Sequence, residues 1–145
     1  MTTDELKKYC DGEFQSIDRI AQELFSVYIP DKTEYSLSEK ASIYAFLANI
    51  YSGFENILKQ MLIFDKLDIA DSPGWHEKVL KKAGEIGILT PELFPIFSKY
   101  LAFRNYFTYA YIFNIQWDET RGLIDAISDV LAKFRAEVYE YIQTI

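Results

Sequence analysis

Apolar side chains recur at steps of three and four residues along most of this chain, and the segment 37–62 shows this pattern on two faces. One stripe contains Leu37, Ala41, Tyr44, Ala48, Tyr51, Leu58 and Leu62, and the other contains Ile43, Leu47, Ile50, Phe54, Ile57 and Met61. A helix that is apolar on two faces is buried on two sides. The segment therefore predicts either the central helix of a bundle or a helix that packs on its own domain and on a second subunit.

Capping patterns precede the first two predicted helices. Thr2 and Glu5 have the spacing of a capping box, and Ser36 and Glu39 repeat it before the two-sided segment. Pro30 lies between the two helices and predicts the end of the first.

Three further patterns mark the later helices. Residues 72–74 (SPG) predict a break, Thr90 followed by Pro91 predicts a helix start, and Asp118 is the expected cap of the last helix. No segment alternates with period two over a useful length. The sequence therefore predicts an all-α fold, a bundle of five antiparallel helices in a single domain that covers residues 1–145.

Composition narrows the setting in which this chain works. Half of its residues are hydrophobic and 17% are aromatic, which is enough for a packed core. Cys10 is the one cysteine, so no intramolecular disulfide is possible, and the first residues lack the apolar segment of a signal peptide. We expect a soluble, cytoplasmic protein. The net charge of −7 disfavours broad nucleic-acid binding and leaves room only for a narrow, local site.

The stretch FRNYFTYAY, residues 103–111, concentrates polar and aromatic side chains within one predicted helix. Arg104 and Tyr111 are seven residues apart and share one side of a straight helix, whereas Tyr109 falls well off that side. For Arg104 and Tyr109 to serve one site, the helix must end or bend there, or a two-fold partner must supply the second copy. The non-functional alternative is that the aromatic residues of this stretch, Phe103, Phe107 and Tyr111, simply pack in the hydrophobic core.

Glu55 and Arg104 are charged residues inside predicted helices that are otherwise mostly apolar. A buried charge is costly unless it is paired, so we expect these two side chains to meet. Either they form a structural ion pair, or the Glu55 carboxylate orients the guanidinium toward a phosphate. His76 is the only histidine, and a lone histidine beside Trp75 is more often a helix-start or packing residue than a catalyst. The pattern predicts no metal site and no cofactor.

Three motifs together resemble the HEPN superfamily, and within it the HepT-like ribonuclease toxins. YSGFENILKQ (residues 51–60) is similar to the family's tyrosine-x-glycine-x-glutamate helix, and GWH (residues 74–76) to its tryptophan–histidine segment. FRNYFTYAYIFNIQW (residues 103–117) is similar to the end of the fourth helix and the following turn. The resemblance covers roughly residues 5 to 143.

The resemblance implies an all-helical homodimer whose motif helices meet at the dimer interface, and a metal-independent ribonuclease activity. In that scheme Arg104 stabilises phosphate charge, Asn105 supports it, and the motif histidine handles a proton as the RNA 2′-oxygen attacks. It also implies a small nucleotidyltransferase antitoxin as partner, which attaches AMP to the motif tyrosine, here Tyr111. RNA or a nucleotide is the implied ligand.

This chain departs from the family pattern at Tyr109, which stands at the position of the motif histidine. Tyrosine titrates near pH 10, whereas histidine titrates near neutrality, and losing a general acid–base group costs about 10²–10⁴-fold in rate. The sequence therefore predicts an impaired ribonuclease of the HepT-like toxin family. The alternative is a non-catalytic module that binds a nucleotide, RNA or a nucleotidyltransferase.

Overall fold

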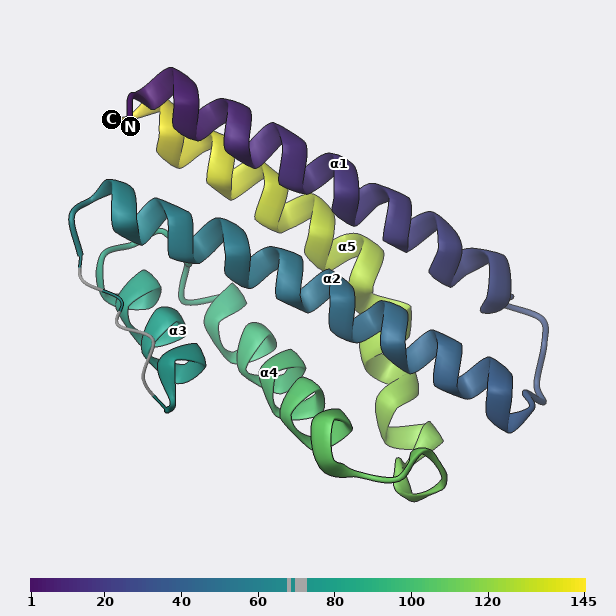
Figure 1. The fold of residues 1–145 in the computed structure, drawn as a ribbon. Helices are drawn as coiled ribbons and strands as arrows, with labels where there is room; N and C mark the ends of the chain where they lie inside the picture. The colour runs from purple at the N-terminus through teal and green to yellow at the C-terminus, as the bar shows by residue number, and fades with distance from the viewer. Residues whose placement is uncertain (68, 70–72) are drawn as a thin grey trace.

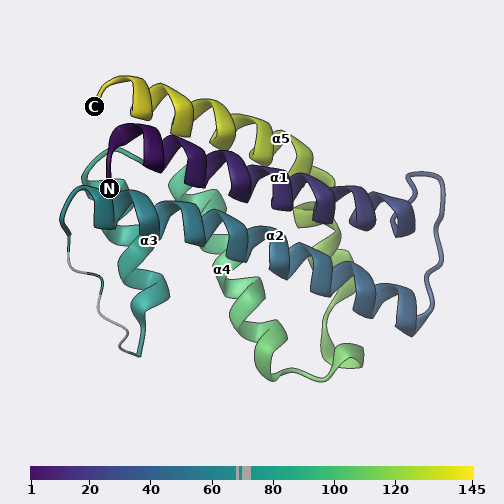
Figure 2. The same cartoon turned by 45° about the horizontal axis from the view of Figure 1, so that its top comes forward.

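The computed structural model describes residues 1–67, 69 and 73–145, and these residues form an all-α bundle. The elements in chain order are α1 (Thr3–Val27), α2 (Leu37–Phe64), α3 (Trp75–Glu85), α4 (Leu93–Tyr109), the 3₁₀ helix η1 (Ile112–Asn114) and α5 (Trp117–Gln143) (Figure 1). The predicted fold class and its five α-helices are confirmed within the described ranges. Both termini lie at the same end of the bundle in the two views (Figure 2).

The first two helices begin at their predicted caps. Ser36 Oγ accepts a hydrogen bond from the Glu39 backbone N–H at 3.1 Å, and the Glu39 carboxylate accepts one from the Ser36 N–H at 2.8 Å, which completes the capping box. Thr2 Oγ1 accepts from the Glu5 N–H at 3.1 Å. Here the Glu5 carboxylate accepts from the Thr2 hydroxyl at 3.3 Å. Both segments therefore satisfy backbone donors that a helix start leaves free.

The later helix starts match the predictions less closely. Thr90 Oγ1 accepts from the Leu93 N–H at 3.4 Å, as expected of a cap, although α4 itself begins only at Leu93. The prediction for Asp118 is wrong, because α5 begins at Trp117 and Asp118 lies in its first turn. A carboxylate there still favours the positive end of the helix dipole. Of the predicted break at 72–74, Ser72 lies outside the described residues, and Gly74 adopts a left-handed φ of 81°.

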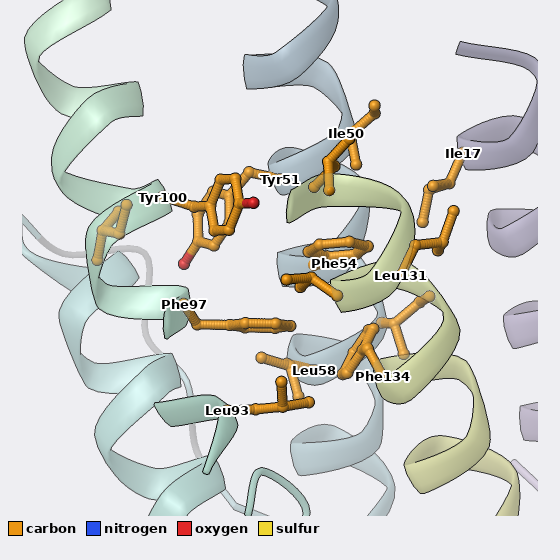
Figure 3. Close-up of a cluster of buried hydrophobic side chains, with 14 of the residues drawn as sticks. Ile17, Ile50, Tyr51, Phe54, Leu58, Leu93, Phe97, Tyr100, Leu131 and Phe134 are labelled. Carbon is orange, nitrogen blue, oxygen red and sulfur yellow. The ribbon is translucent and has the colours of Figure 1, made fainter. Parts of the chain in front are cut away.

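α2 is the central helix, as its two apolar stripes predict. α1 packs along one side of it, and α3 and α4 pack on another (Figures 1 and 2). Phe54 of α2 stacks on Phe97 of α4 with ring centroids 5.1 Å apart, and Phe134 of α5 meets both rings at 5.0 Å (Figure 3). Helices of the same chain thus bury both faces of α2, which was the first of the two predicted arrangements.

None of the helices in the described residues is long and apolar enough to cross a membrane. Cys10 is buried in α1 and is a free thiol, as its being the single cysteine requires. Burial raises the pKa of that thiol to about 12. A buried thiol of this kind behaves as a small apolar side chain.

Candidate functional site

The end of α4 is where the FRNYFTYAY stretch changes direction. The helix stops at Tyr109, and the backbone of Tyr111 is extended before η1 begins. The predicted need for the helix to end or bend near Tyr109 is therefore met within a single chain. Tyr109 is 86% exposed and Tyr111 is 72% exposed, whereas Arg104 lies half-buried one to two turns earlier on α4.

Arg104 and Asn105 begin a chain of polar contacts that joins α4 to α3. Arg104 Nη1 donates to Asn105 Oδ1 at 3.2 Å. Asn105 Nδ2 in turn donates to the Glu77 carboxylate on α3 at 3.4 Å. The Arg104 guanidinium is thus held from one side by an amide that is itself anchored on a neighbouring helix. This arrangement restricts its orientation and leaves other N–H groups for an anion.

Glu55 is buried, at 2% exposure, but its partner differs from the predicted one. Its Oε1 atom lies 2.7 Å from Nδ1 of His76 at the start of α3. No ion pair joins Glu55 to Arg104 in the described part of the chain, so the predicted direct meeting of the two is wrong. The reason is that the first turn of α3 docks on α2 and delivers the imidazole to the carboxylate. Arg104 acts instead on Tyr51, where its charge opposes the rise in the pKa of the phenol.

His76 is the site residue that sequence reasoning missed. Its side chain is 19% exposed, and the Trp75 ring lies over it with centroids 3.7 Å apart. Lys59 of α2 covers the Trp75 ring at 4.4 Å, so a cation–π contact adds to the docking of α3. One signal could have found this contact. Glu55 required a buried cationic or hydrogen-bonding partner, and His76 begins an amphipathic helix.

Tyr51 lies one turn before Glu55 on α2 and is fully buried (Figure 3). Burial raises the pKa of the Tyr51 phenol above its ordinary value, the Glu55 carboxylate adds to the rise, and Arg104 opposes it. Tyr51 and Glu55 influence each other electrostatically without forming a hydrogen bond of good geometry. Neither Tyr51 Oη nor Glu55 Oε2 has a hydrogen-bond partner among the residues described. Buried polar atoms of this kind are uncommon and costly in packed proteins.

We use the name polar junction for the six residues that these contacts connect, which come from α2, α3 and α4: Tyr51, Glu55, His76, Glu77, Arg104 and Asn105. A cavity of about 330 Å³ between α3 and α4 is lined by Glu77 and Asn105 together with apolar side chains. Over the described ranges no three His, Cys, Asp or Glu side chains gather as a metal site. The junction offers two carboxylates, an imidazole and a guanidinium.

Four exposed aromatic side chains surround the end of α4: Tyr106, Tyr109, Tyr111 and Phe113. The rings of Tyr111 and Phe113 are stacked, with centroids 5.5 Å apart and an interplanar angle of 4°. Tyr106 donates a hydrogen bond to the Asn114 carbonyl at 3.3 Å, which ties α4 to η1. Flat aromatic faces open to solvent are suited to stacking on nucleobases.

Charge is distributed unevenly along the sequence. Residues 73–111 carry five Lys or Arg and three Asp or Glu, whereas the rest of the chain carries ten and nineteen. The segment that forms α3 and α4 is thus net positive in a protein whose net charge is −7. A local basic region on an acidic protein attracts anions at short range while the remainder repels them.

The fold and the site define a class: an all-α bundle with an Arg-Asn pair, and a tyrosine just past it, at the end of the fourth helix. The family model described as "HepT-like protein" matches residues 42–145, and this chain belongs to that family. The matched region holds α2 from its second turn onward and all of α3 to α5, and with them the polar junction. No curated protein and no solved structure gives a significant match.

Proposed function

We propose that this protein is a HepT-like toxin homologue of a toxin–antitoxin system, and that it binds RNA at the end of α4. Arg104 is the phosphate ligand, and Asn105 holds the guanidinium in place. The observation that carries this proposal is the half-buried Arg104, tied by Asn105 to Glu77, beside the exposed Tyr109 and Tyr111. Family membership, the net positive α3–α4 segment and the exposed aromatic rings support it.

The proposed reaction is metal-independent RNA cleavage at a reduced rate. In the family pattern the residue at position 109 is the histidine that transfers a proton, and here it is tyrosine. Tyr109 makes no hydrogen bond within the described residues that could activate its hydroxyl, and it is almost fully solvent-exposed. A tyrosine in that setting is a poor proton donor or acceptor at neutral pH.

A small nucleotidyltransferase antitoxin is the proposed partner, and Tyr111 is the proposed site at which it attaches AMP. The exposure of Tyr111, at 72%, gives a modifying enzyme access to the hydroxyl. A second copy of this chain is proposed as a homodimer partner, which would bring two copies of the motif into one cleft. Both assignments follow from the family resemblance and are tested separately from RNA binding.

The test is an RNA cleavage and binding assay on wild type, Arg104→Ala, Tyr109→His and the control Arg19→Ala. Arg19 is exposed on α1, so its removal changes the net charge equally at a remote position. We expect Arg104→Ala to weaken RNA binding at least tenfold. Tyr109→His should raise cleavage by about 10–100-fold, within the range of a restored acid–base group. Equal RNA binding by folded Arg104→Ala and Arg19→Ala proteins would contradict the proposal.

The second candidate is a non-catalytic module that binds RNA, a nucleotide or the nucleotidyltransferase without turnover. The isolation of the exposed Tyr109 hydroxyl favours it. This candidate predicts RNA binding that depends on Arg104 but gives no cleavage products from wild type, even after long incubation. Cleavage that is lost in Arg104→Ala separates the two candidates.

A further inference from the structure

The pairing of Glu55 with His76 leaves one ring nitrogen of the imidazole free to act. Oε1 of the buried Glu55 lies 2.7 Å from Nδ1 of His76. The two ring nitrogens of an imidazole point in diverging directions. Nε2 therefore faces away from α2, on a side chain that is 19% exposed. A carboxylate on one nitrogen fixes the orientation and the tautomer of the ring, an arrangement that occurs at sites where histidine transfers protons.

The neighbours of His76 belong to the proposed RNA site. The next residue, Glu77, accepts the hydrogen bond from Asn105, and Asn105 holds Arg104. Glu55 of α2 is the charged group in contact with the imidazole, and Lys59 of α2 lies over the ring of the preceding Trp75. Arg104 of α4 acts electrostatically on Tyr51, one turn before Glu55 on α2. The single histidine and the phosphate-binding arginine thus lie in one connected network.

We propose that His76, oriented by Glu55, is the proton-transferring group of the Arg104 site, in place of the missing histidine at position 109. This inference rests on the proposed RNA-directed function and names the residue that carries its residual chemistry. The geometric support is the 2.7 Å contact that holds the imidazole on the buried Glu55 carboxylate.

The step balances without a metal or a cofactor. His76 Nε2 takes the proton of the RNA 2′-hydroxyl as the 2′-oxygen forms a bond to phosphorus. The bond from phosphorus to the 5′-oxygen breaks, and the leaving oxygen takes a proton from water, so the products are a 2′,3′-cyclic phosphate and a 5′-hydroxyl. The imidazolium then returns its proton to solvent. Arg104 stabilises the charge that develops on the phosphate oxygens, and Glu55 stabilises the imidazolium.

The competing role for the Glu55–His76 pair is a purely structural tether between α2 and α3. Two variants separate the roles. His76→Asn places an amide donor where Nδ1 now lies, so it keeps a hydrogen bond to Glu55 and removes the titrating ring. Glu55→Gln keeps the shape of the side chain and its ability to accept from Nδ1, and removes the charge that stabilises the imidazolium.

The experiment measures cleavage of a single-stranded RNA by wild type and both variants between pH 5 and 8, with RNA affinity measured in parallel. In wild type we expect a rate that rises with pH through the range in which histidine titrates and then levels. His76→Asn should lose at least 100-fold in rate and the pH-dependent rise, with affinity within threefold of wild type. Glu55→Gln should lower the rate, because it removes the charge that stabilises the imidazolium, with affinity again within threefold of wild type.

Two results would overturn this inference while leaving the proposed RNA binding at Arg104 intact. One is RNA binding that depends on Arg104 in a wild-type protein that forms no cleavage product. The other is cleavage that Arg104→Ala abolishes but folded His76→Asn leaves unchanged in rate and pH profile. Failure of the proposed function looks different, because RNA binding would then be insensitive to Arg104→Ala.

Discussion

On one side of α2, α1 and α5 bury apolar side chains against it, and on the other side α3 and α4 enclose the polar junction. On the first side Phe54 meets Phe134, and Gly53 lies directly under Ile17. On the second, Glu55 and Tyr51 are buried with one polar atom each left without a hydrogen bond. The same helix thus supports close packing on one face and tolerates a costly polar arrangement on the other.

This difference indicates which region of the molecule contributes stability and which region is a candidate for function. Close packing contributes stability in proportion to buried apolar area, while unpaired buried polar atoms reduce it. A region that gives up stability is a candidate functional site, because such arrangements persist only when another requirement maintains them. Substitutions on the apolar face of α2 should therefore mainly lower stability, whereas substitutions in the polar junction should mainly weaken RNA binding.

The largest expected loss of stability is for Phe97→Ala. Phe97 is fully buried, and its ring contacts those of Tyr51, Phe54 and Phe134. Removing a buried phenylalanine costs about 3–5 kcal/mol, a large share of the stability of a domain of this size. Urea unfolding followed by circular dichroism measures this. A loss below about 1 kcal/mol would show that this aromatic cluster does not form the core.

Gly53→Ala should have the next largest effect. A Cβ atom at Gly53 would lie 2.5 Å from Cγ1 and 2.8 Å from Cδ1 of Ile17, so α1 and α2 would have to separate. Overpacking costs about 1–3 kcal/mol, and the better helix propensity of alanine returns up to about 1 kcal/mol. The net expectation is a destabilisation of about 1–2 kcal/mol.

Gly12→Ala is the matched control for this substitution, because no atom lies within 4 Å of a Cβ added there. It should stabilise α1 by about 0.5–1 kcal/mol. If both alanine variants stabilise the protein equally, the α1–α2 contact is looser than the described packing requires.

Two tyrosine substitutions compare a satisfied buried hydroxyl with the unpartnered one of the polar junction. Tyr100 Oη donates to the Leu123 carbonyl at 2.7 Å, whereas Tyr51 Oη has no partner among the described residues. Tyr100→Phe should cost about 0.5–1.5 kcal/mol, because it leaves a carbonyl short of a hydrogen bond. Tyr51→Phe should change the free energy of unfolding by less than about 0.5 kcal/mol, or stabilise slightly, because it removes a buried hydroxyl without a partner.

The same two substitutions should have the reverse ranking in their effect on RNA affinity. In an RNA-binding titration, Tyr51→Phe should weaken binding and Tyr100→Phe should not. Tyr51 belongs to the polar junction beside Arg104, and Tyr100 does not. A greater stability loss from Tyr51→Phe than from Tyr100→Phe would remove the contrast between the faces.

Phe113→Ala should have the smallest effect on stability. Phe113 is 69% exposed, and among the described residues its ring stacks on Tyr111 alone, so its removal should alter the free energy of unfolding by less than about 0.5 kcal/mol. RNA binding should nevertheless weaken about fivefold or more, since stacking contributes about 1–3 kcal/mol per base. Unchanged RNA affinity would exclude the stacked pair from the binding surface.

Local patterns carry enough information to predict the fold of this chain but only part of its site. The two apolar stripes of 37–62 identify the central helix, and the Ser36 capping box fixes its start, because both depend on spacing within one element. Asp118 was misplaced as a cap because helix boundaries depend on turn geometry, here the 3₁₀ turn before Trp117.

The partner of Glu55 could not be predicted in the same way. The sequence indicates that a buried carboxylate needs a partner, but Arg104 and His76 both satisfied that requirement. Only the docking angle of α3 on α2 selects His76, and that angle is set by tertiary packing such as the Lys59–Trp75 contact. The end of α4 at Tyr109 was predicted as one of two options, since neither glycine nor proline marks it.

The most direct test of the central claim, that the polar junction receives RNA, is a titration followed by the NMR signals of the imidazole. His76 is the only histidine, so a ¹⁵N-labelled protein gives one set of ring-nitrogen signals. We expect a short single-stranded RNA to shift the Nε2 signal in wild type and Arg19→Ala, and not in Arg104→Ala. An unchanged His76 signal in a wild-type protein saturated with RNA would contradict the account.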